Sequence, residues 1–201
     1  MPSLDTLEAI AVPMPAGDID TDQILPARFM HAHRVDYGRY CFHDQRFDAQ
    51  SGERLAASVL NRREYERAGM LVVGPNFGCG SSREQAVQTL VDFGIRVIVG
   101  TTFGDIFFIN CLKNGLLPVR AEAGFVGQAL RQLAQRPGAT MKVDLPAQRV
   151  VAPDGTAAAF EIDGFSKQAL VEGLDEIDIT LQLAAQIDQY ERRNGLIAEN
   201  S

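Results

Sequence analysis

Short apolar runs alternate with segments of helical spacing through the middle of this 201-residue chain. Residues 70–73 form a continuous apolar run of the length and composition typical of a buried strand. In residues 82–93 apolar side chains recur at helical spacing, and a β-branched run at 95–99 follows after one turn residue. This order predicts a strand, a crossover helix and a second, parallel strand.

The alternation continues on both sides of this unit. Residues 9–12 predict an earlier strand, residues 105–113 a helix closed by Gly115, and residues 116–119 a further strand. Residues 37–61 show no clear periodicity, so we expect an excursion outside the core, with an exposed turn at 48–52.

The last third of the chain changes character. Three short β-rich runs around a turn at 153–155 predict antiparallel strands at 141–145, 149–152 and 158–162. A final helix is expected at about 181–193, with Leu183, Ala184, Ile187 and Tyr190 on one face. Together these elements predict an α/β fold with a parallel βαβ core and additional antiparallel strands.

Composition limits the class of protein. A chain of 201 residues that is 46% hydrophobic predicts one well-buried domain over residues 1–201. The net charge of -7 and the dispersed Lys and Arg residues argue against a nucleic-acid partner. No apolar segment approaches the roughly 20 residues that span a bilayer, and the first residues do not resemble a signal peptide. We therefore expect a cytoplasmic protein.

The three cysteines, Cys41, Cys79 and Cys111, are far apart and have only three histidines to complement them. No C-x-x-C spacing occurs, so the sequence predicts no metal or iron–sulfur site within this chain. Cys111 lies in an apolar helical stretch and is expected to be a buried small hydrophobe. For Cys79, inside a glycine-rich loop, a packing role is favoured over a ligand role.

That glycine-rich loop, residues 74–86, carries the strongest chemical signal. It joins the end of a strand to the start of a helix, where free N–H groups and the helix dipole favour an anion. Two phosphate motifs fail: Arg83 stands where a dinucleotide fingerprint needs glycine, and a P-loop lysine is missing. The planar fork of Arg83 instead suits a carboxylate, which favours a di- or tricarboxylic acid.

The two serines of the loop have competing interpretations. Ser82 with Gln85, or Ser81 with Glu84, has the spacing of a capping box, so we expect one serine to cap the helix. The other hydroxyl is then free for chemistry. Lowering a serine pKa by five units amounts to about 7 kcal/mol, whereas a helix terminus supplies at most ~2 kcal/mol. A serine base would therefore need further positive charge, part of it from a cation outside this chain.

Four motifs in order resemble one known family. Residues 76–84, Asn-Phe-Gly-Cys-Gly-Ser-Ser-Arg-Glu, look like the signature of the swivelling domain of the aconitase superfamily. Residues 20–26, 105–110 and 173–177 resemble its other motifs, so the resemblance covers nearly the whole chain. It implies a swivelling three-layer β/β/α domain.

The resemblance also implies a function. It is to the small subunit of a heterodimeric hydro-lyase, whose large subunit carries a four-iron four-sulfur cluster. The implied reaction interconverts 2-isopropylmalate and 3-isopropylmalate in leucine synthesis, by loss and re-addition of water. Carried over by motif, Ser81 would be the catalytic base, and Ser82 and Arg83 would bind a substrate carboxylate beside the loop backbone of Gly78, Cys79 and Gly80.

Two further residues are candidates by the same resemblance. Asp22 matches an active-site aspartate, and Arg34 matches a second carboxylate-binding arginine across a gap. Each also has a structural interpretation, a local Asx-turn for Asp22 and a solvated surface position for Arg34.

Gln85 departs from the family pattern, which usually has histidine at this position. Glutamine cannot carry a proton charge near neutrality, so the substrate assignment stays open. Related hydro-lyases acting on citramalate, dimethylmalate or homoaconitate remain alternatives. A different alternative is a non-catalytic anion-binding or regulatory module.

Overall fold

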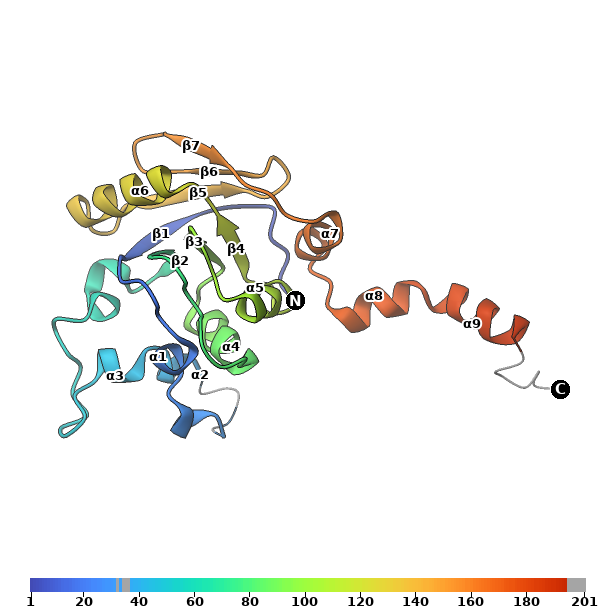
Figure 1. Ribbon diagram of the computed structural model, residues 1–201, viewed down its shortest axis with the longest axis horizontal. Helices are drawn as coiled ribbons and strands as arrows, with labels where there is room; N and C mark the ends of the chain where they lie inside the picture. Colours follow the sequence, from blue (N-terminus) through green and yellow to red (C-terminus); the bar gives the residue numbers. More distant parts are fainter. Residues whose placement is uncertain (32, 34–36, 195–201) are drawn as a thin grey trace.

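One seven-stranded sheet forms the centre of the computed structural model, which describes residues 1–31, 33 and 37–194 (Figure 1). The strands lie in the order β4-β3-β2-β1-β5-β6-β7. Their bounds are β1 Thr6–Met14, β2 Ala68–Val73, β3 Val97–Gly100, β4 Leu117–Arg120, β5 Thr140–Asp144, β6 Arg149–Val151 and β7 Ala157–Ala159.

Strands β1 to β4 form a parallel half-sheet, in which β2 pairs with β1 and β3, and β3 pairs with β4. Helix α4 (Glu84–Phe93) connects β2 to β3, and helix α5 (Asp105–Lys113) connects β3 to β4. Gly115 follows α5 with φ 75°, the left-handed conformation expected after a helix. The predicted strand–helix–strand unit and its continuation are confirmed.

Strands β5 to β7 form the antiparallel half-sheet, and β5 also pairs antiparallel with β1. The predicted antiparallel strands, and with them the α/β class, are confirmed. Strand β1 is longer than predicted because it joins the two halves: Thr6 to Ile10 pair with β5, and Ile10 to Met14 pair with β2.

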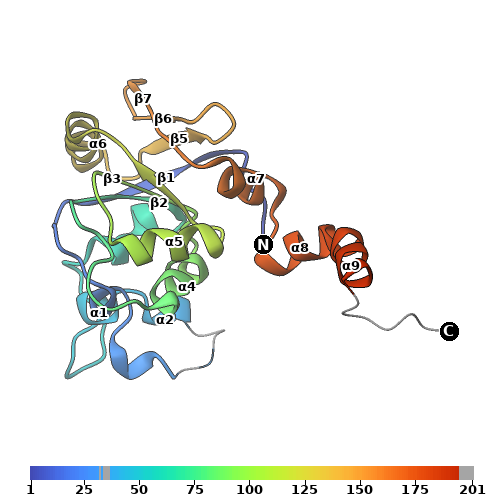
Figure 2. The same ribbon diagram turned by 45° about the vertical axis from the view of Figure 1, so that its right-hand side comes forward.

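The parallel half-sheet is buried on both faces, and β2 shows how the sequence produces this. Its residues Met70, Leu71, Val72 and Val73 are all fully buried, but successive side chains point to opposite faces. Leu71 and Val73 join the hydrophobic cluster under α4 and α5, while Met70 and Val72 join the cluster under α6 (Ala123–Gln135). Figure 2 shows α6 on one side of the parallel strands and α4 and α5 on the other.

Helix α6 was not predicted, although its sequence carries a signal. The buried residues Phe125, Val126, Ala129 and Leu133 recur at helical spacing along one face of α6. The helix contacts β1, β2 and β3. It therefore supplies the cover that a sheet buried on both faces requires.

The segment between β1 and β2 corrects one expectation. Its described residues form α1 (Thr21–Ile24), α2 (Tyr37–Tyr40), α3 (His43–Arg46) and 3₁₀ turns at Ala27–Phe29, Val59–Asn61 and Arg63–Tyr65. Cys41, Phe42 and Leu60 from this segment lie in the core cluster under α4. The prediction of an excursion outside the core is therefore wrong here, because helices this short show no readable periodicity.

The turn predicted at residues 48–52 is confirmed. One carboxylate oxygen of Asp48 accepts hydrogen bonds from the backbone N–H groups of Gln50 and Ser51, at 3.0 and 2.8 Å. Residues 49–52 of this turn are exposed.

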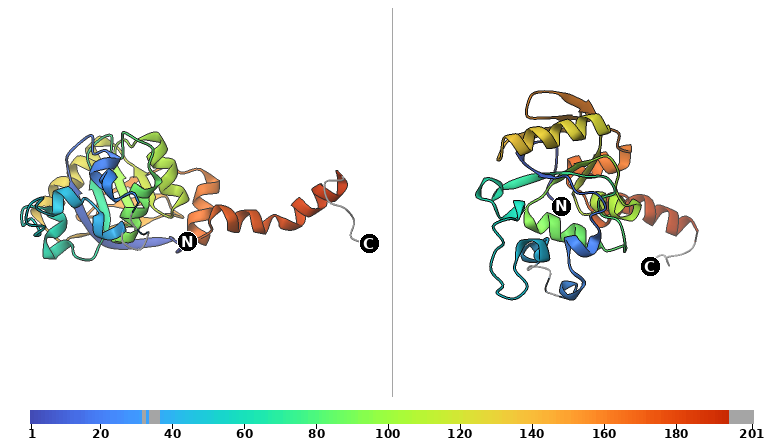
Figure 3. Two further views of the ribbon diagram at one scale, coloured as in Figure 1. Left: turned by 90° about the horizontal axis from the view of Figure 1, so that it is seen from below. Right: turned by 60° about the vertical axis from the view of Figure 1, so that its left-hand side comes forward.

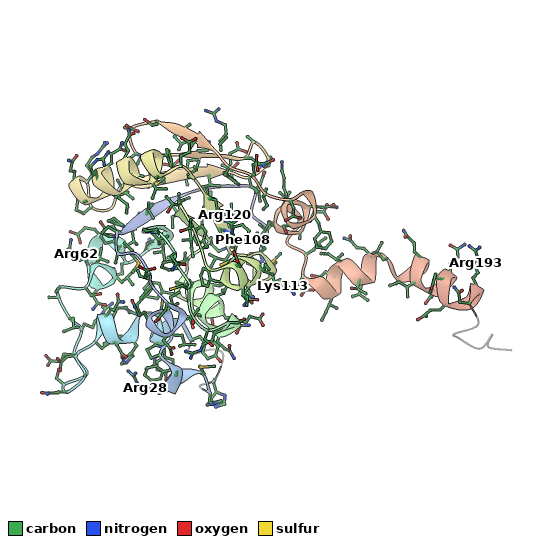
Figure 4. All side chains as sticks on the ribbon, in the orientation of Figure 1. Arg28, Arg62, Phe108, Lys113, Arg120 and Arg193 are labelled. Carbon is green, nitrogen blue, oxygen red and sulfur yellow. The ribbon has the colours of Figure 1, made fainter. Side chains whose placement is uncertain are left out.

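The carboxyl end of the described chain leaves the body of the molecule. Helix α7 (Gly164–Glu172) packs beside α5, and the N-terminal ammonium group donates to the carbonyl of Gly173 at 2.7 Å. Helices α8 (Glu176–Gln182) and α9 (Ala184–Arg193) then project outward, and we call them the C-terminal arm (Figure 3). Arg193 lies at its far end (Figure 4).

The arm corrects the prediction of one final helix at 181–193. The chain forms two helices that meet at Leu183, and α9 has no buried residue. Leu183, Ile187 and Tyr190, predicted to share one face of that helix, are 44, 38 and 64% exposed. No helix in the described part of the chain is long and apolar enough to cross a membrane.

Candidate functional site

The candidate site lies where three parallel strands end. From β1 the chain leads to Thr21, from β2 to the glycine-rich loop, and from β3 to Gly104. Adjacent connections separate at the carboxyl ends of strands in open α/β sheets, which leaves room for a ligand. A hollow of about 260 Å³ occupies this position. It is lined by Thr21, Gly78, Cys79, Gly80, Ser81, Ser82, Arg83, Gly104, Asp105, Ile106 and Phe107.

Hydrogen bonds between the three connections fix the loop backbone. The N–H of Gly78 donates to the carbonyl of Ile19 at 2.7 Å, and the N–H of Gly104 donates to that of Phe77 at 3.0 Å. The N–H of Thr21 donates to the carbonyl of Cys79 at 3.1 Å. The loop is thus paired with both neighbouring connections, although much of it is exposed.

Gly78 shows why this loop needs glycine. Its φ is 73°, and a Cβ at this position would lie 2.2 Å from the Cγ atom of Phe107. The Phe107 ring packs edge-on against Phe77, with ring centroids 5.6 Å apart. Both the left-handed backbone and the close approach of α5 therefore exclude a side chain at residue 78.

The start of α4 corrects the capping prediction. Arg83 occupies the N-cap position, and no side chain makes a capping hydrogen bond there. Ser81 and Ser82 precede the cap, are exposed and line the hollow. The prediction that one serine caps the helix is wrong, because the helix begins one residue later than the Ser82 spacing requires and two residues later than the Ser81 spacing requires.

Arg83 is held by a carboxylate from another part of the chain. Its guanidinium donates to Asp22 and forms an ion pair with it. The Arg83 side chain is 16% exposed and that of Asp22 is 50% exposed, so the arginine is mostly enclosed and the carboxylate is half in solvent. The pair fixes the arginine at the rim of the hollow while its remaining N–H donors stay available.

The alternative interpretation of Asp22 is not supported by its contacts. The local turn bond is made by Asp20, whose carboxylate accepts from the N–H of Gln23 at 2.8 Å and caps α1. Asp22 instead reaches across to the glycine-rich loop, 61 positions away in sequence. The structure therefore brings together Asp22, Ser81, Ser82 and Arg83.

The sequence also named Arg34 and Gln85. Arg34 lies outside the described residues. Gln85 is half-buried in the first turn of α4. Its backbone carbonyl accepts a hydrogen bond from the hydroxyl of Thr89 at 2.7 Å.

A carboxylate guest fits one side of the hollow better than the other. The amino ends of α4 and α5 both meet it, and the first N–H groups of a helix lack intrahelical partners. Asp105 in the first turn of α5 lines the hollow and would repel an anion, whereas Arg83 at the start of α4 attracts one. Glu84, in the first turn of α4, is not part of the lining, and its carboxylate accepts from the side-chain amide of Asn114 at 3.0 Å. Anion binding is therefore favoured at the Arg83 side.

The cysteines show no ligand chemistry. Burial raises the pKa of Cys41 to about 12 and raises that of Cys111 well above its usual value. Burial, together with Asp20 and Asp18, also raises the pKa of Cys79, so its thiol stays protonated near neutrality. Within the described residues no three His, Cys, Asp or Glu side chains are grouped to hold a metal ion, so these residues do not fit an iron–sulfur cluster.

Thr21 and the first turn of α5 are the site components that sequence reasoning missed. Thr21 is 1% exposed, and its hydroxyl donates to the carbonyl of Ser81 at 2.8 Å. Ile106 and Phe107 line the hollow beside Gly104. The signal was available in part, because Thr21 lies within one quoted motif and the first turn of α5 within another.

A second hollow, of about 290 Å³, lies between α5, α7 and α8. Its lining is mostly apolar and includes Phe108, Ile109, Leu112, Phe165 and Leu174. Its polar lining is Lys113, Asp163, Ser166 and Asp175, without an arginine or a pair of adjacent serines, so the candidate site is the hollow at the glycine-rich loop.

The fold and the site define a class of protein, an α/β sheet with a glycine-rich loop and a hollow at the carboxyl ends of its parallel strands. Comparison with known proteins identifies the family. Residues 1–124 match the family model described as the aconitase C-terminal domain, and residues 128–164 match a second model described as LeuD_N. The chain therefore belongs to the aconitase C-terminal domain family, which confirms the resemblance seen in its motifs.

Its relatives narrow the family further. The chain is 46% identical over 197 residues to the 3-isopropylmalate dehydratase small subunit of Phenylobacterium zucineum, covering 98% of this chain and 96% of that protein. It is 42% identical over 194 residues to the protein of the same name from Rhodopseudomonas palustris strain BisA53, covering 96% of each.

A solved structure agrees in fold. The crystal structure of 3-isopropylmalate dehydratase from Methanocaldococcus jannaschii superposes with a TM-score of 0.67 at 23% identity, covering 92% of this chain and 99% of that chain.

Proposed function

We propose that this chain is the small subunit of a hydro-lyase that interconverts 2-isopropylmalate and 3-isopropylmalate in leucine synthesis. Relatives that match nearly its whole length carry the name of that subunit. The observation that carries the proposal is the meeting of Ser81, Ser82 and Arg83 at one hollow where three parallel strands end.

In this proposal each side chain has a separate task. Arg83 binds a substrate carboxylate through its planar fork, and Asp22 holds that fork in place. Ser82 donates a hydrogen bond to the same carboxylate. Ser81 removes the proton from one carbon while the hydroxyl group leaves the neighbouring carbon, which gives the alkene. In the return step the hydroxyl adds to the carbon that lost the proton, and Ser81 delivers a proton to the carbon that lost the hydroxyl.

The active pair needs a second chain. Arg83 is the charged donor next to Ser81, and Asp22 partly neutralises it, so this chain alone does not supply the several kcal/mol that a serine base needs. The name of its relatives implies a large subunit. We propose that the large subunit carries the four-iron four-sulfur cluster, which would supply positive charge for the leaving hydroxyl group.

The remaining parts of the proposal concern the chain as a whole. We propose that residues 1–201 form one swivelling domain that closes over the large subunit in the cytoplasm. Arg34 would then join the site from the segment before α2 and bind a second carboxylate of the substrate.

Replacing each loop serine by alanine tests the proposal. In the reconstituted pair, Ser81→Ala is expected to lower kcat about 10²- to 10⁴-fold, the usual contribution of a general base. Ser82→Ala is the matched control, because it removes the neighbouring hydroxyl from the same exposed loop. It should mainly raise KM. Absorbance of the alkene intermediate measures both, and near wild-type kcat in Ser81→Ala would refute the base assignment.

The substrate is tested separately. Gln85 stands where the family usually has histidine, so citramalate, dimethylmalate and homoaconitate are assayed beside isopropylmalate. The proposal expects the highest kcat/KM for isopropylmalate. If no malate derivative were turned over by the pair, a non-catalytic anion-binding or regulatory module would be the better description.

A further inference from the structure

Thr21 is a buried polar residue in direct contact with the loop that carries the proposed base. Its side chain is among the few buried polar side chains of the described residues, at 1% exposure. Its hydroxyl donates to the carbonyl of Ser81 at 2.8 Å, and its N–H donates to the carbonyl of Cys79 at 3.1 Å. One residue therefore holds two loop carbonyls, one on each side of Gly80.

The neighbours of Thr21 make this contact rigid. Asp20 pairs with Cys79 as an isolated parallel bridge, and its carboxylate caps α1. Asp22 forms the ion pair with Arg83. Three consecutive residues of one turn thus contact the loop from Cys79 to Arg83, and Thr21 is the one that contacts Ser81.

We propose that Thr21 is a positioning residue for Ser81. The Thr21 hydroxyl fixes the plane of the peptide that follows Ser81, and this plane sets the direction in which the Ser81 side chain leaves the backbone. Because Ser81 is exposed, its own side chain has little packing to hold it. The inference rests on the proposed function for the role of Ser81, but the role of Thr21 is tested separately from it.

Small errors of position are costly for proton transfer. A displacement of about 1 Å at a reacting group can lower the rate about 10²-fold. Without the Thr21 hydroxyl, the Ser81 carbonyl must find water or turn away, and either change rotates the Ser81 backbone. Arg83 keeps its Asp22 partner, so substrate binding should change much less than turnover.

Three variants of the chain, each paired with its large subunit, separate positioning from stability. Thr21→Val removes the hydroxyl at nearly constant volume, and Thr21→Ser keeps it. Thr89→Val is the matched control: Thr89 is 0% exposed and its hydroxyl donates to a carbonyl at 2.7 Å, but that carbonyl belongs to Gln85 inside α4. Both valine variants therefore lose one buried hydrogen bond to a backbone carbonyl.

We expect Thr21→Val to lower kcat about 10- to 100-fold and to change KM less than about threefold. Thr21→Ser should restore most of the lost kcat. Thr89→Val should keep kcat within about twofold of wild type, although its loss of thermal stability should be similar to that of Thr21→Val. Equal kcat values for Thr21→Val and Thr89→Val would overturn the inference. Should Thr21→Val not fold, Thr21→Cys replaces it, because a thiol is a weak donor of similar size. Full turnover in Thr21→Cys would then count equally against the inference.

A double variant tests whether Thr21 acts through Ser81. In the Ser81→Ala background, Thr21→Val should cause no further loss of kcat, because the group that it positions is gone. A further loss of about tenfold or more would show that Thr21 acts elsewhere. If instead Ser81→Ala retained wild-type turnover, the proposed role of Ser81 would fail. Wild-type turnover in Thr21→Val with an inactive Ser81→Ala would overturn only the inference about Thr21.

Discussion

The glycine-rich loop and the C-terminal arm are both exposed, but they are held in opposite ways. The loop has irregular backbone and is fixed by hydrogen bonds to residues far away in sequence, such as Ile19 and Thr21. The arm is regular helix, yet Ile177, Leu181 and Tyr190 are 70, 65 and 64% exposed. In this molecule the irregular loop is therefore held by more long-range contacts than the regular helices of the arm.

The physical reason lies in where each segment finds its partners. Helices of seven and ten residues are marginal in water without tertiary packing. The arm has local bonds, whereas the loop lies between two strand ends and the buried ring of Phe107. A small substitution in the loop should therefore change stability or activity strongly, whereas a larger truncation of a side chain in the arm should change them little.

The largest effect is expected at Gly78. Gly78→Ala must adopt a left-handed backbone and push against Phe107, and together these cost about 2–5 kcal/mol of unfolding free energy. Thermal unfolding of the isolated subunit measures this. Gly155→Ala is the matched control: its φ is 90°, but no atom lies within 4 Å of the added Cβ. If both variants lost the same stability, close packing of the loop would not be what holds it.

The second effect is expected at Arg83. Arg83→Lys keeps the charge but loses the fork, and we expect KM to rise about 10- to 100-fold with a smaller change in kcat, since a charged hydrogen bond contributes ~1.5–3 kcal/mol. Steady-state kinetics of the pair measure it. Arg193→Lys at the end of the arm makes the same change far from the site and should leave KM unaltered. An unchanged KM in Arg83→Lys would contradict carboxylate binding by this residue.

A smaller effect is expected in the arm. Leu181 is 65% exposed, so Leu181→Ala should change the unfolding free energy of the isolated subunit by less than about 0.5 kcal/mol. Leu170→Ala in α7 makes the same change at a fully buried position and should cost about 2–5 kcal/mol. Denaturant unfolding compares them. A large loss in Leu181→Ala would mean that the arm packs on the body.

The smallest effect is expected when the pH is lowered and the cap of α8 is protonated. Hydrogen bonds from the backbone N–H groups of Asp178 and Ile177 lower the pKa of Asp175, which caps α8. A lowered folded pKa means that the cap stabilises the helix above the unfolded value of about 3.9 and is lost as pH falls through the folded value. Circular dichroism should therefore show α8 fraying below about pH 4 in wild type.

The control for this effect is Asp175→Asn, which can still cap but does not titrate. Its helix signal should lose less than that of wild type over the same pH range. Equal losses in both proteins would assign the acid change to other carboxylates.

The parts of the fold that were predicted from sequence are those with a clear repeat. The continuous apolar run of β2 reflects burial on both sides of the strand, and the helical spacing of α4 reflects burial of one helix face. Both patterns are local, so the parallel unit could be predicted. In the segment from Tyr37 to Asn61 the helices are only one turn long, so the apolar residues show no helical repeat. The burial of Phe42 could therefore not be predicted from the sequence.

The residues that the structure brings together at the hollow were named from the sequence, but their arrangement was not. The motif gave Ser81, Ser82 and Arg83, because they are neighbours in sequence. It could not give the bond from Thr21 to Ser81, which joins positions 60 apart. The capping expectation failed for a different reason: α4 begins at Glu84, so neither serine stands at the N-cap position.

The close approach of Gly78 and Phe107 also constrains how this chain can change over time. A side chain at residue 78 could be accommodated only if the ring on α5 became smaller in the same lineage. Gly78→Ala combined with Phe107→Leu should therefore recover part of the stability that Gly78→Ala loses alone. The glycine-rich loop and helix α5 would then have to change together during evolution. A chimera that takes the loop from one distant relative and α5 from another should therefore be less stable at the site than either parent.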